Sequence, residues 1–300
     1  MLIDDLREGK TKYGKPDKTI ETVLSFIFIF GHRVLKVYKH RKTFYGDMSE
    51  QSFRKHFYDD DFSWSKAAAP DIYLALRSFG IGKTRDWAIE MRRIDASNDL
   101  TNLLPAGKLR PIDMSTIALS IVRILSKLSH KKKKLLTKYS YHEYIEDLDA
   151  WIKNLHPHIP LNQSREIISK LSKIAHEEPY FKKNAKKFSI AIDSNSDNLL
   201  FIDGKPSYID IMPPKKEWRV SDPQFCITRL SVDAEVLGNK ILAQRVHTVR
   251  EKAHGKLPKK ALLAYQLHAA SIQWAYRTEL KQSGLAKKYR TFILDLLSKI

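Results

Sequence analysis

The first third of the chain alternates apolar and polar positions as strands do, with one helical pattern in between. Segments rich in β-branched and aromatic residues recur there and predict strands. Phe30-Gly31-His32-Arg33 predicts a turn, which joins the first two of these strands as an antiparallel hairpin. The predicted strands are residues 22–29, 34–39, 72–76 and 87–91. Between the second and third, apolar residues recur at helical spacing up to Ala68, with Ser49 as N-cap and Pro70 as the stop. This order predicts a small α+β lobe over residues 15–95.

From Asp113 onward the apolar spacing becomes mainly helical. The predicted helices are residues 113–130, 142–155, 164–175, 222–237 and 257–300. The predicted strands are residues 188–192, 199–202 and 206–210. Asp203-Gly204 separates the last two strands and is a strong signal for a two-residue hairpin turn. The second part of the chain is therefore predicted to be mainly helical, with one short hairpin.

The composition is that of a globular protein of one large or two ordinary domains, with 300 residues of which 43% are hydrophobic. A single cysteine, Cys226, excludes an internal disulfide and a cysteine-cluster zinc site, and it fits a reducing compartment. The first 20 residues lack the apolar stretch of a signal peptide, and the longest apolar run, Val23–Phe30, is too short to span a bilayer. The expected location is cytoplasmic.

The formal net charge of +19 raises the expectation of an anionic partner. The lysines are spread along the chain, however, so a solvated basic surface is the equal alternative. The run Lys131–Lys134 ends a predicted helix, where positive charge complements the helix dipole, and a phosphate-backbone contact is the alternative.

The segment from Asp193 to Asp210 carries the most informative polar pattern. If Asp203-Gly204 turns the hairpin, Asn198 and Asp210 lie six residues to either side of Gly204 and face each other at its open end. An amide oxygen and a carboxylate brought together in this way form a partial magnesium site. Asp193, in the loop that enters the hairpin, is placed to accept the proton of an attacking hydroxyl.

Several polar residues can be interpreted without a functional role. An Asp-Ser-Asn-Ser-Asp-Asn run such as 193–198 is more often a polar turn, and only its placement opposite Asp210 favours the metal site. Asp197 fits a solvated loop carboxylate better than a supplementary ligand. His156 and His158 flank a proline without a third ligand, so we assign them no role.

Five short motifs follow one another along the chain: Glu21-Thr22, Gly31-His32-Arg33-Val34-Leu35-Lys36, Ala69-Pro70-Asp71-Ile72-Tyr73-Leu74, Ala88-Ile89-Glu90-Met91-Arg92-Arg93 and Leu200-Phe201-Ile202-Asp203-Gly204. Their order resembles the aminoglycoside phosphotransferase family and its kinase-like relatives, and in particular a bacterial subgroup of unknown substrate, over residues 20–280. The resemblance implies an α+β, two-lobed protein-kinase-like fold. Residues 1–95 would form a nucleotide-binding lobe with a small antiparallel sheet, in which residues 1–20 are compatible with a flexible segment. Residues 96–300 would form a larger, mainly helical lobe with the catalytic loop and the metal-binding hairpin.

The resemblance also implies roles for individual residues. Lys36 looks like the strand lysine that contacts the nucleotide phosphates, with Lys39 as the fallback. The helix carboxylate that pairs with this lysine is expected at Asp61, with Asp60 as the second choice. Glu90-Met91 looks like the hinge whose backbone meets the adenine. By the same resemblance Asp193 would be the catalytic base, and Asp222 either steadies the catalytic loop or caps the helix that follows it.

These assignments imply a phosphotransferase that uses ATP or GTP with Mg²⁺ and acts on a hydroxyl of an unidentified acceptor. A pseudokinase that binds nucleotide or partners is the alternative, because Ala191-Ile192 stand where the family usually has His-Gly. A basic nucleic-acid-associated protein is the second alternative. Polycationic antibiotics would call for an acidic cleft, whereas this chain is strongly basic, so the expected acceptor is anionic or macromolecular.

Overall fold

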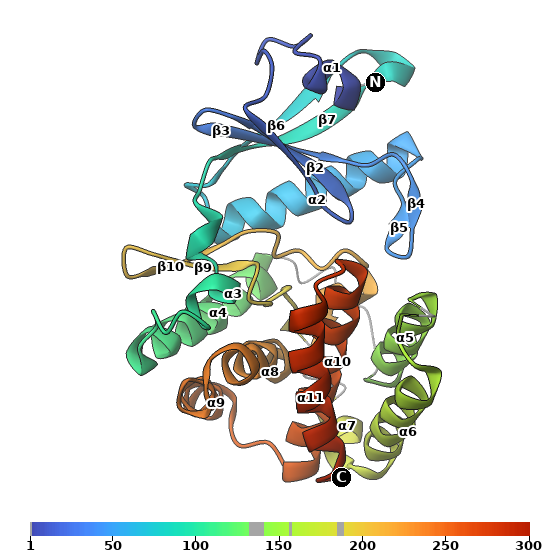
Figure 1. Ribbon diagram of the computed structural model, residues 1–300, viewed down its shortest axis with the longest axis vertical. Coiled ribbons are helices and arrows are strands. Elements are labelled where there is room, and N and C mark those ends of the chain that lie inside the picture. The colour runs from blue at the N-terminus through green and yellow to red at the C-terminus, as the bar shows by residue number, and fades with distance from the viewer. Residues whose placement is uncertain (1, 132–140, 156–157, 185–188) are drawn as a thin grey trace. The chain divides into compact units, whose positions relative to one another are not determined.

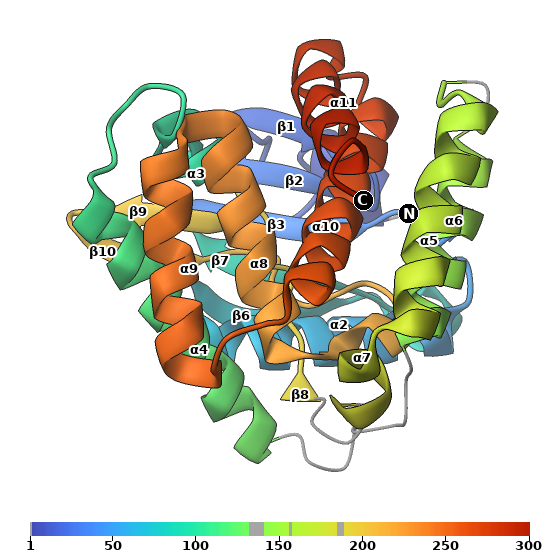
Figure 2. The same cartoon turned by 90° about the horizontal axis from the view of Figure 1, so that it is seen from below.

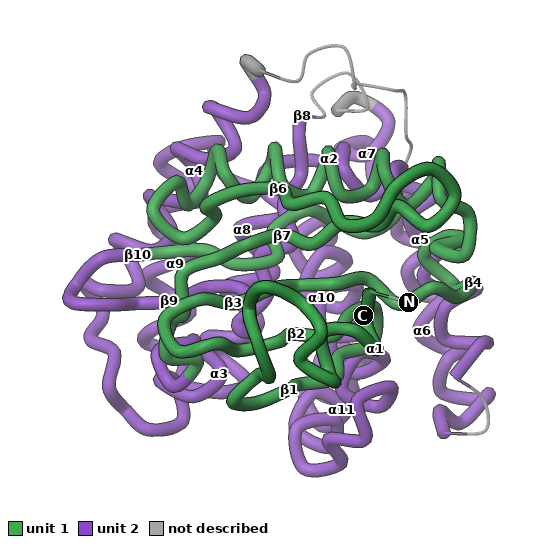
Figure 3. The backbone as a smooth tube through the Cα atoms, turned by 90° about the horizontal axis from the view of Figure 1, so that it is seen from above, with its two compact units in different colours: residues 1–96, 207–215 green, residues 97–206, 216–300 purple. Residues whose placement is uncertain are grey.

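The computed structural model divides into two compact units, shown in different colours in Figure 3. The first comprises Met1–Ala96 with Ser207–Lys215, and the second comprises Ser97–Pro206 with Lys216–Ile300. The structure describes residues 2–131, 141–155, 158–184 and 189–300. The predicted α+β class is confirmed, since an antiparallel sheet dominates the first unit and helices dominate the second (Figure 1).

The first unit is built on a five-stranded sheet in the order β1-β2-β3-β7-β6, in which all neighbours are antiparallel. Its strands are β1 (Lys18–Glu21), β2 (Ser25–Phe30), β3 (Arg33–Tyr38), β6 (Tyr73–Phe79) and β7 (Asp86–Arg92). Its other elements are α1 (Leu2–Arg7), the short pair β4 (Lys42–Thr43) and β5 (Gly46–Asp47), α2 (Gln51–Ala68) and the 3₁₀ turns η1 (Gly82–Thr84) and η2 (Ala96–Asn98), the last of which starts at the unit boundary. The predicted hairpin, helix and two later strands are confirmed, whereas α1 and β1 were not predicted.

Strand β3 is buried along almost its whole length, so its alternate side chains serve two different faces of the sheet. Leu35 and Val37 join an apolar cluster with Leu2, Ile3 and Leu6 of α1. Lys36 and Tyr38 point to the other face, where α2 supplies their hydrogen-bond partners. The alternation therefore places a lysine on the α2 face of the sheet.

Of two local predictions in the first unit, the turn at Gly31 is confirmed and the helix N-cap at Ser49 is not. Gly31 lies at φ 55° between paired Phe30 and Arg33, so glycine fits the first central position of this two-residue turn, as predicted. Ser49 as N-cap was wrong. Glu50 occupies that position without a side-chain cap, because the Ser49 hydroxyl donates to Asp47 instead.

The second unit packs long helices around α10, which is buried along most of its length (Figure 2). Its helices are α3 (Leu100–Leu103), α4 (Pro111–Lys131), α5 (Tyr141–Asn154), α6 (Leu161–Glu177), α7 (Pro179–Asn184), α8 (Pro223–Asp233), the π-helical turn η5 (Ala234–Gly238), α9 (Lys240–His254), α10 (Lys259–Glu279) and α11 (Ser283–Leu297). The 3₁₀ turn η4 (Glu217–Arg219) precedes β11 (Val220–Ser221), which pairs with β8 (Ser189–Ile190). Helix α9 was not predicted. The region predicted as helical from 257 divides into α10 and α11.

The predicted hairpin is present as β9 (Leu199–Ile202) and β10 (Lys205–Tyr208). Asp203 at φ 49° and Gly204 at φ 75° give the two positive φ values of a type I′ turn, as the Asp-Gly pair predicts. The expected strand to residue 210 was too long. Asp210 lies beyond β10 at φ 48°, a value that interrupts an extended strand.

Some other predictions differ from the structure, and some fall on residues outside the described ranges. The expected strand over residues 188–192 is reduced to β8, because the chain turns into a loop at Ala191. Lys132–Lys134, His156 and Phe188 lie outside the described residues. None of the helices in the described ranges is long and apolar enough to cross a membrane.

Candidate active site

Lys36 is the centre of a buried ion-pair cluster in the first unit. Its Nζ lies 3.0 Å from Oδ2 of Asp61 on α2 and 2.7 Å from Oδ1 of Asp210. Only 6% of the Lys36 side chain is exposed, and 2% of that of Asp61. Burial opposes the charge of the ammonium, but the Asp210 and Asp61 carboxylates outweigh it and raise the pKa of Lys36 well above its ordinary value. Lys36 is therefore held as a cation between two carboxylates.

Three hydroxyl groups fix the carboxylates of this cluster. Tyr38 and Ser65 donate to the two oxygens of Asp61, and Tyr73 accepts the backbone N–H of Asp210 at 2.8 Å. Burial and the neighbouring Asp61 raise the pKa of Tyr38 well above its usual value, so this hydroxyl keeps its proton. The cluster is thus a connected network, in which Tyr73 was not anticipated from the sequence.

The helical spacing of α2 explains why Asp61 occupies this position. Its buried residues follow one stripe, and Asp61 lies on it with Phe57, Tyr58 and Trp64. Asp60 lies about 100° further around the helix, off this stripe. Lys39, the fallback for Lys36, instead binds the backbone oxygen of Thr22 and the carboxylate of Glu21.

Glu90 and Met91 lie inside the sheet, on strand β7, which pairs with β3 on one side and β6 on the other. The Glu90 carboxylate is buried and accepts hydrogen bonds from Arg33 at 2.7 Å and Arg77 at 2.5 Å. Its side chain therefore ties together three strands of the sheet. The adenine contact of this pair stays a prediction.

The loop that carries Asp193 and Asn198 lies in the second unit, between β8 and β9. The Asn195 side chain accepts the backbone N–H groups of Asp197 and Asn198, at 3.0 and 3.1 Å. The Asn198 side-chain nitrogen donates to the backbone oxygen of Asp193 at 3.2 Å. These contacts close the loop on itself, so the run of Asp, Ser and Asn does form a polar turn.

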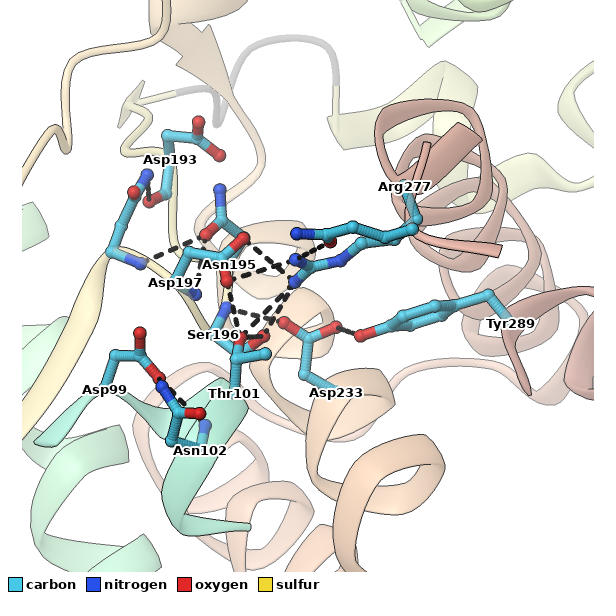
Figure 4. A network of polar contacts seen from close by, with 12 residues as sticks. Asp99, Thr101, Asn102, Asp193, Asn195, Ser196, Asp197, Asp233, Arg277 and Tyr289 are labelled. Atoms are coloured by element: carbon cyan, nitrogen blue, oxygen red, sulfur yellow. Dashed lines mark hydrogen bonds and ion pairs between the residues drawn. The ribbon is translucent and has the colours of Figure 1, made fainter. Parts of the chain in front are cut away.

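Asp193 makes an ion pair with Arg229 of α8, whose Nη2 lies 2.5 Å from Oδ1 of Asp193. The Asp193 side chain is 24% exposed and that of Arg229 is 13% exposed. Burial opposes the charge of Arg229, but the Asp193 carboxylate outweighs it and the pKa of the guanidinium is raised. In Figure 4 the Asp193 carboxylate points away from the rest of the loop network. It is thus oriented by an arginine that the sequence did not single out.

Residues of α3, α8 and α10 also hold the loop (Figure 4). Arg277 of α10 is almost fully buried and contacts the Asp197 carboxylate, with Nη2 2.9 Å from Oδ2. Thr101 donates to the same carboxylate at 2.7 Å. Asp233 of α8 accepts the backbone N–H of Ser196 and the hydroxyl of Tyr289, both at 2.7 Å. Asp197 is therefore a structural anchor of this loop rather than a solvated carboxylate.

We expect the contribution of Asp233 to the stability of the native chain to fall between about pH 4 and pH 6. Burial raises the pKa of its carboxyl from 3.8 to about 6, so the folded state binds this proton more tightly than the unfolded state. Ionisation above that range costs on the order of 2–3 kcal/mol of unfolding free energy. Asp233→Asn keeps a side-chain oxygen that can accept the N–H of Ser196, but it cannot ionise. This variant should therefore lose the part of the pH dependence of stability that comes from Asp233. Urea unfolding at pH 4.5 and pH 7 measures the free energy of unfolding of the native chain and of the variant. If this free energy changed equally with pH in both proteins, the prediction would be wrong.

Asp222 caps α8, since its side chain accepts the N–H of Gln224 at 2.8 Å. It also accepts hydrogen bonds from the hydroxyls of Tyr180 and Tyr265. The capping alternative is therefore confirmed.

Arg229, Asp233 and Arg277 were missed because each meets its loop partner from 36 to 80 residues away in the chain. No local motif contains both partners. The usable signal was a charged residue on the buried face of an otherwise apolar helix, since such residues are rarely buried without a partner.

The comparisons with known proteins give structural matches only. No family model matches the chain, and no curated protein does. Among solved structures, a thermostable mutant of aminoglycoside phosphotransferase APH(4)-Ia, in ternary complex with AMP-PNP and hygromycin B, is 13% identical. It has a TM-score of 0.59, with 99% of this chain and 98% of that chain covered. The GDP complex of wild-type aminoglycoside 2'-phosphotransferase-IIIa is 9% identical, with a TM-score of 0.59 over 99% and 98% of the two chains.

A choline/ethanolamine kinase family protein from Mesorhizobium loti is also similar. It is 12% identical, with a TM-score of 0.53 over 100% of this chain and 93% of that chain. At these identities the similarity shows the fold. The predicted resemblance to aminoglycoside phosphotransferases and their kinase-like relatives is thus confirmed at the level of structure, and this chain has the fold those proteins share.

Proposed function

We propose that the chain is a phosphotransferase that moves the terminal phosphoryl group of ATP or GTP to a hydroxyl. The observation that carries this proposal is the Lys36 ammonium, buried between Asp61 and Asp210 in the first unit. A strand lysine fixed by a helix carboxylate provides a preorganised charge for nucleotide phosphates. Residues 1–95 would act as the nucleotide-binding lobe, with the adenine near Glu90-Met91, and residues 96–300 would carry the catalytic loop.

The donor set suits Mg²⁺ in chemical type. Among the described residues no three His, Cys, Asp or Glu side chains gather as a metal site. Magnesium does not require such a cluster, because one or two protein oxygens with substrate phosphates and water are enough. Asp210 offers a carboxylate, and the Asn198 amide donates through its nitrogen, so its oxygen is the atom suited to the metal. These two residues lie in different units, and their convergence on one ion stays a prediction.

The remaining chemistry falls to side chains of this protein. Bound Mg²⁺ would neutralise charge on the phosphates, and Lys36 would hold the same phosphates from the sheet. Asp193 would accept the proton of the acceptor hydroxyl as its oxygen bonds to the terminal phosphorus and the bond to the nucleoside diphosphate breaks. Arg229 would keep the Asp193 carboxylate oriented until that transfer.

We propose an acceptor that is anionic or macromolecular. Hygromycin B, an aminoglycoside, occupies one of the similar structures, but a polycation would be repelled by a chain with net charge +19.

We expect ATP or GTP with Mg²⁺ to raise the melting temperature of the native chain by roughly 5 °C at a hundred times the dissociation constant. Asp210→Asn should lose the part of this rise in melting temperature that depends on Mg²⁺, because the substitution removes the charged metal ligand. Thermal-shift measurements with and without Mg²⁺ check this. Asp203→Asn, at the exposed hairpin turn, is the matched control and should respond like the native chain. The absence of any magnesium-dependent shift in the native chain would reject the nucleotide site.

A nucleotide-binding protein without catalysis is the second candidate. Ala191-Ile192 provide no imidazole beside Asp193, and Arg229 occupies an oxygen of the carboxylate that would act as base. This candidate predicts the same thermal shift with no phosphoryl transfer. Phosphate release or acceptor phosphorylation that depends on Asp193 would exclude it.

A further inference from the structure

The first unit contains a hollow of about 920 Å³ that shares no residue with the Lys36 cluster. Its walls come from α1 and the segment after it, the start of α2, and the turn between β6 and β7. All of these belong to the first unit. A volume of this size is typical of sites for small molecules.

The walls of the hollow are strongly basic. Two aspartates, Asp5 and Asp86, face six cationic side chains, which are Lys10, Lys12, Arg54, Arg77, Lys83 and Arg85. Three of these cations are already paired with carboxylates, since Arg54 binds Asp86, Arg77 binds Glu90 and Lys10 binds Glu8. Lys12, Lys83 and Arg85 remain against Asp5. The potential inside the hollow therefore favours an anion.

Two of these cations, Lys83 and Arg85, have no carboxylate partner among the residues that the structure describes. They lie on the β6–β7 turn, which is fixed to α2. The side-chain amide of Gln51 donates to the backbone oxygens of Gly82 at 3.1 Å and of Arg85 at 2.6 Å. Gly80 tightens the same turn at φ 67°, where a Cβ would come within 2.7 Å of the Thr84 oxygen. The turn thus presents two uncompensated cations from a fixed backbone, which lowers the entropic cost of binding an anion.

Part of the wall is apolar and aromatic. Tyr13 and Phe79 both line the hollow with ring centroids 6.3 Å apart, and Leu2 lies beside them. Hydroxyl groups of Thr11, Thr84 and Ser78 are also in the wall. The lining of the hollow therefore combines hydrogen-bonding groups, positive charge and an apolar surface.

We propose that this hollow is a second ligand site, which binds a small molecule that carries a phosphate group and an apolar or aromatic part. Lys83 and Arg85 bind the phosphate, and Tyr13 and Phe79 contact the apolar part. The site is separate from the proposed nucleotide site, so its occupancy does not depend on phosphoryl transfer.

Phenyl phosphate is the probe, followed by NMR titration of the full-length chain. The backbone amides of Lys83, Thr84 and Arg85 should shift with saturable binding, and inorganic phosphate should bind several-fold more weakly because it leaves the aromatic wall uncovered. The charge-reversed variant Lys83→Glu/Arg85→Glu should lose at least about tenfold in affinity for phenyl phosphate. Absence of saturable shifts at the turn, or equal affinity for the two probes, would overturn the proposal.

A matched control separates this site from general charge attraction. Lys287→Glu/Lys288→Glu changes the net charge by the same amount on exposed positions of α11 and should leave the affinity unchanged. An equal loss in both double variants would mean that phenyl phosphate senses only the net charge, and this too would overturn the proposal. Lys36→Met tests independence from the nucleotide site, because it should leave the shifts at the turn in place.

Discussion

Asp193→Asn should lower the rate of phosphoryl transfer by about 10²–10⁴-fold while nucleotide binding persists. The amide cannot accept the proton of an attacking hydroxyl, yet its oxygen still accepts the hydrogen bond from Arg229. The loop should therefore keep its conformation. Phosphate release from Mg²⁺·ATP and Mg²⁺·GTP, with water or an added alcohol as acceptor, measures the rate, and the thermal shift measures nucleotide binding.

Asp203→Asn is the matched control, because it makes the same chemical change ten residues away in the chain. Asp203 is exposed and lies at φ 49°, a conformation that asparagine tolerates. Its rate should equal that of the native chain. A residual rate above one tenth of the native value in Asp193→Asn would remove Asp193 as the base.

Only some features of the candidate site could be predicted from the amino-acid sequence, and the hairpin turn is the clearest of them. Asp203-Gly204 predicts its own turn because the backbone there needs two positive φ values. Lys36 and Asp61 were expected as a pair from the family resemblance. Strand alternation explains why Lys36 faces α2, and Asp61 lies on the buried stripe of that helix.

The features of the fold and the site that were not predicted depend on contacts between elements far apart in the sequence. Helix α9 is polar on average, and its packing against α4 and α8 stabilises it. Asp210 was expected at a strand end, but Tyr73 accepts its backbone N–H and holds it in a left-handed conformation. Such a contact between residues 137 positions apart has no signature in either local sequence.

Arg277→Met should lower the free energy of unfolding by about 3 kcal/mol, because it removes one partner of a buried ion pair. The Arg277 side chain is 1% exposed, and its guanidinium joins Asp197 to Thr101 at the centre of the loop (Figure 4). Without it, the Asp197 carboxylate still accepts from the Thr101 hydroxyl but has lost its charged partner, so the amides of Ser196 and Asp197 should exchange hydrogen faster. Urea unfolding and hydrogen exchange measure these two effects.

The double variant Arg277→Met/Asp197→Asn tests whether the ion pair itself is responsible. Removing both charges leaves no buried carboxylate without its partner, so part of the stability should return, with a coupling energy of about 1–3 kcal/mol. Arg290→Met makes the same substitution at an exposed arginine of α11, whose neutral partner is Gln163, and should cost less than about 0.5 kcal/mol. If Arg277→Met and Arg290→Met were equally mild, the other contacts of the loop would be enough to hold it, and Arg277 would have no special part in fixing the segment that carries Asp193.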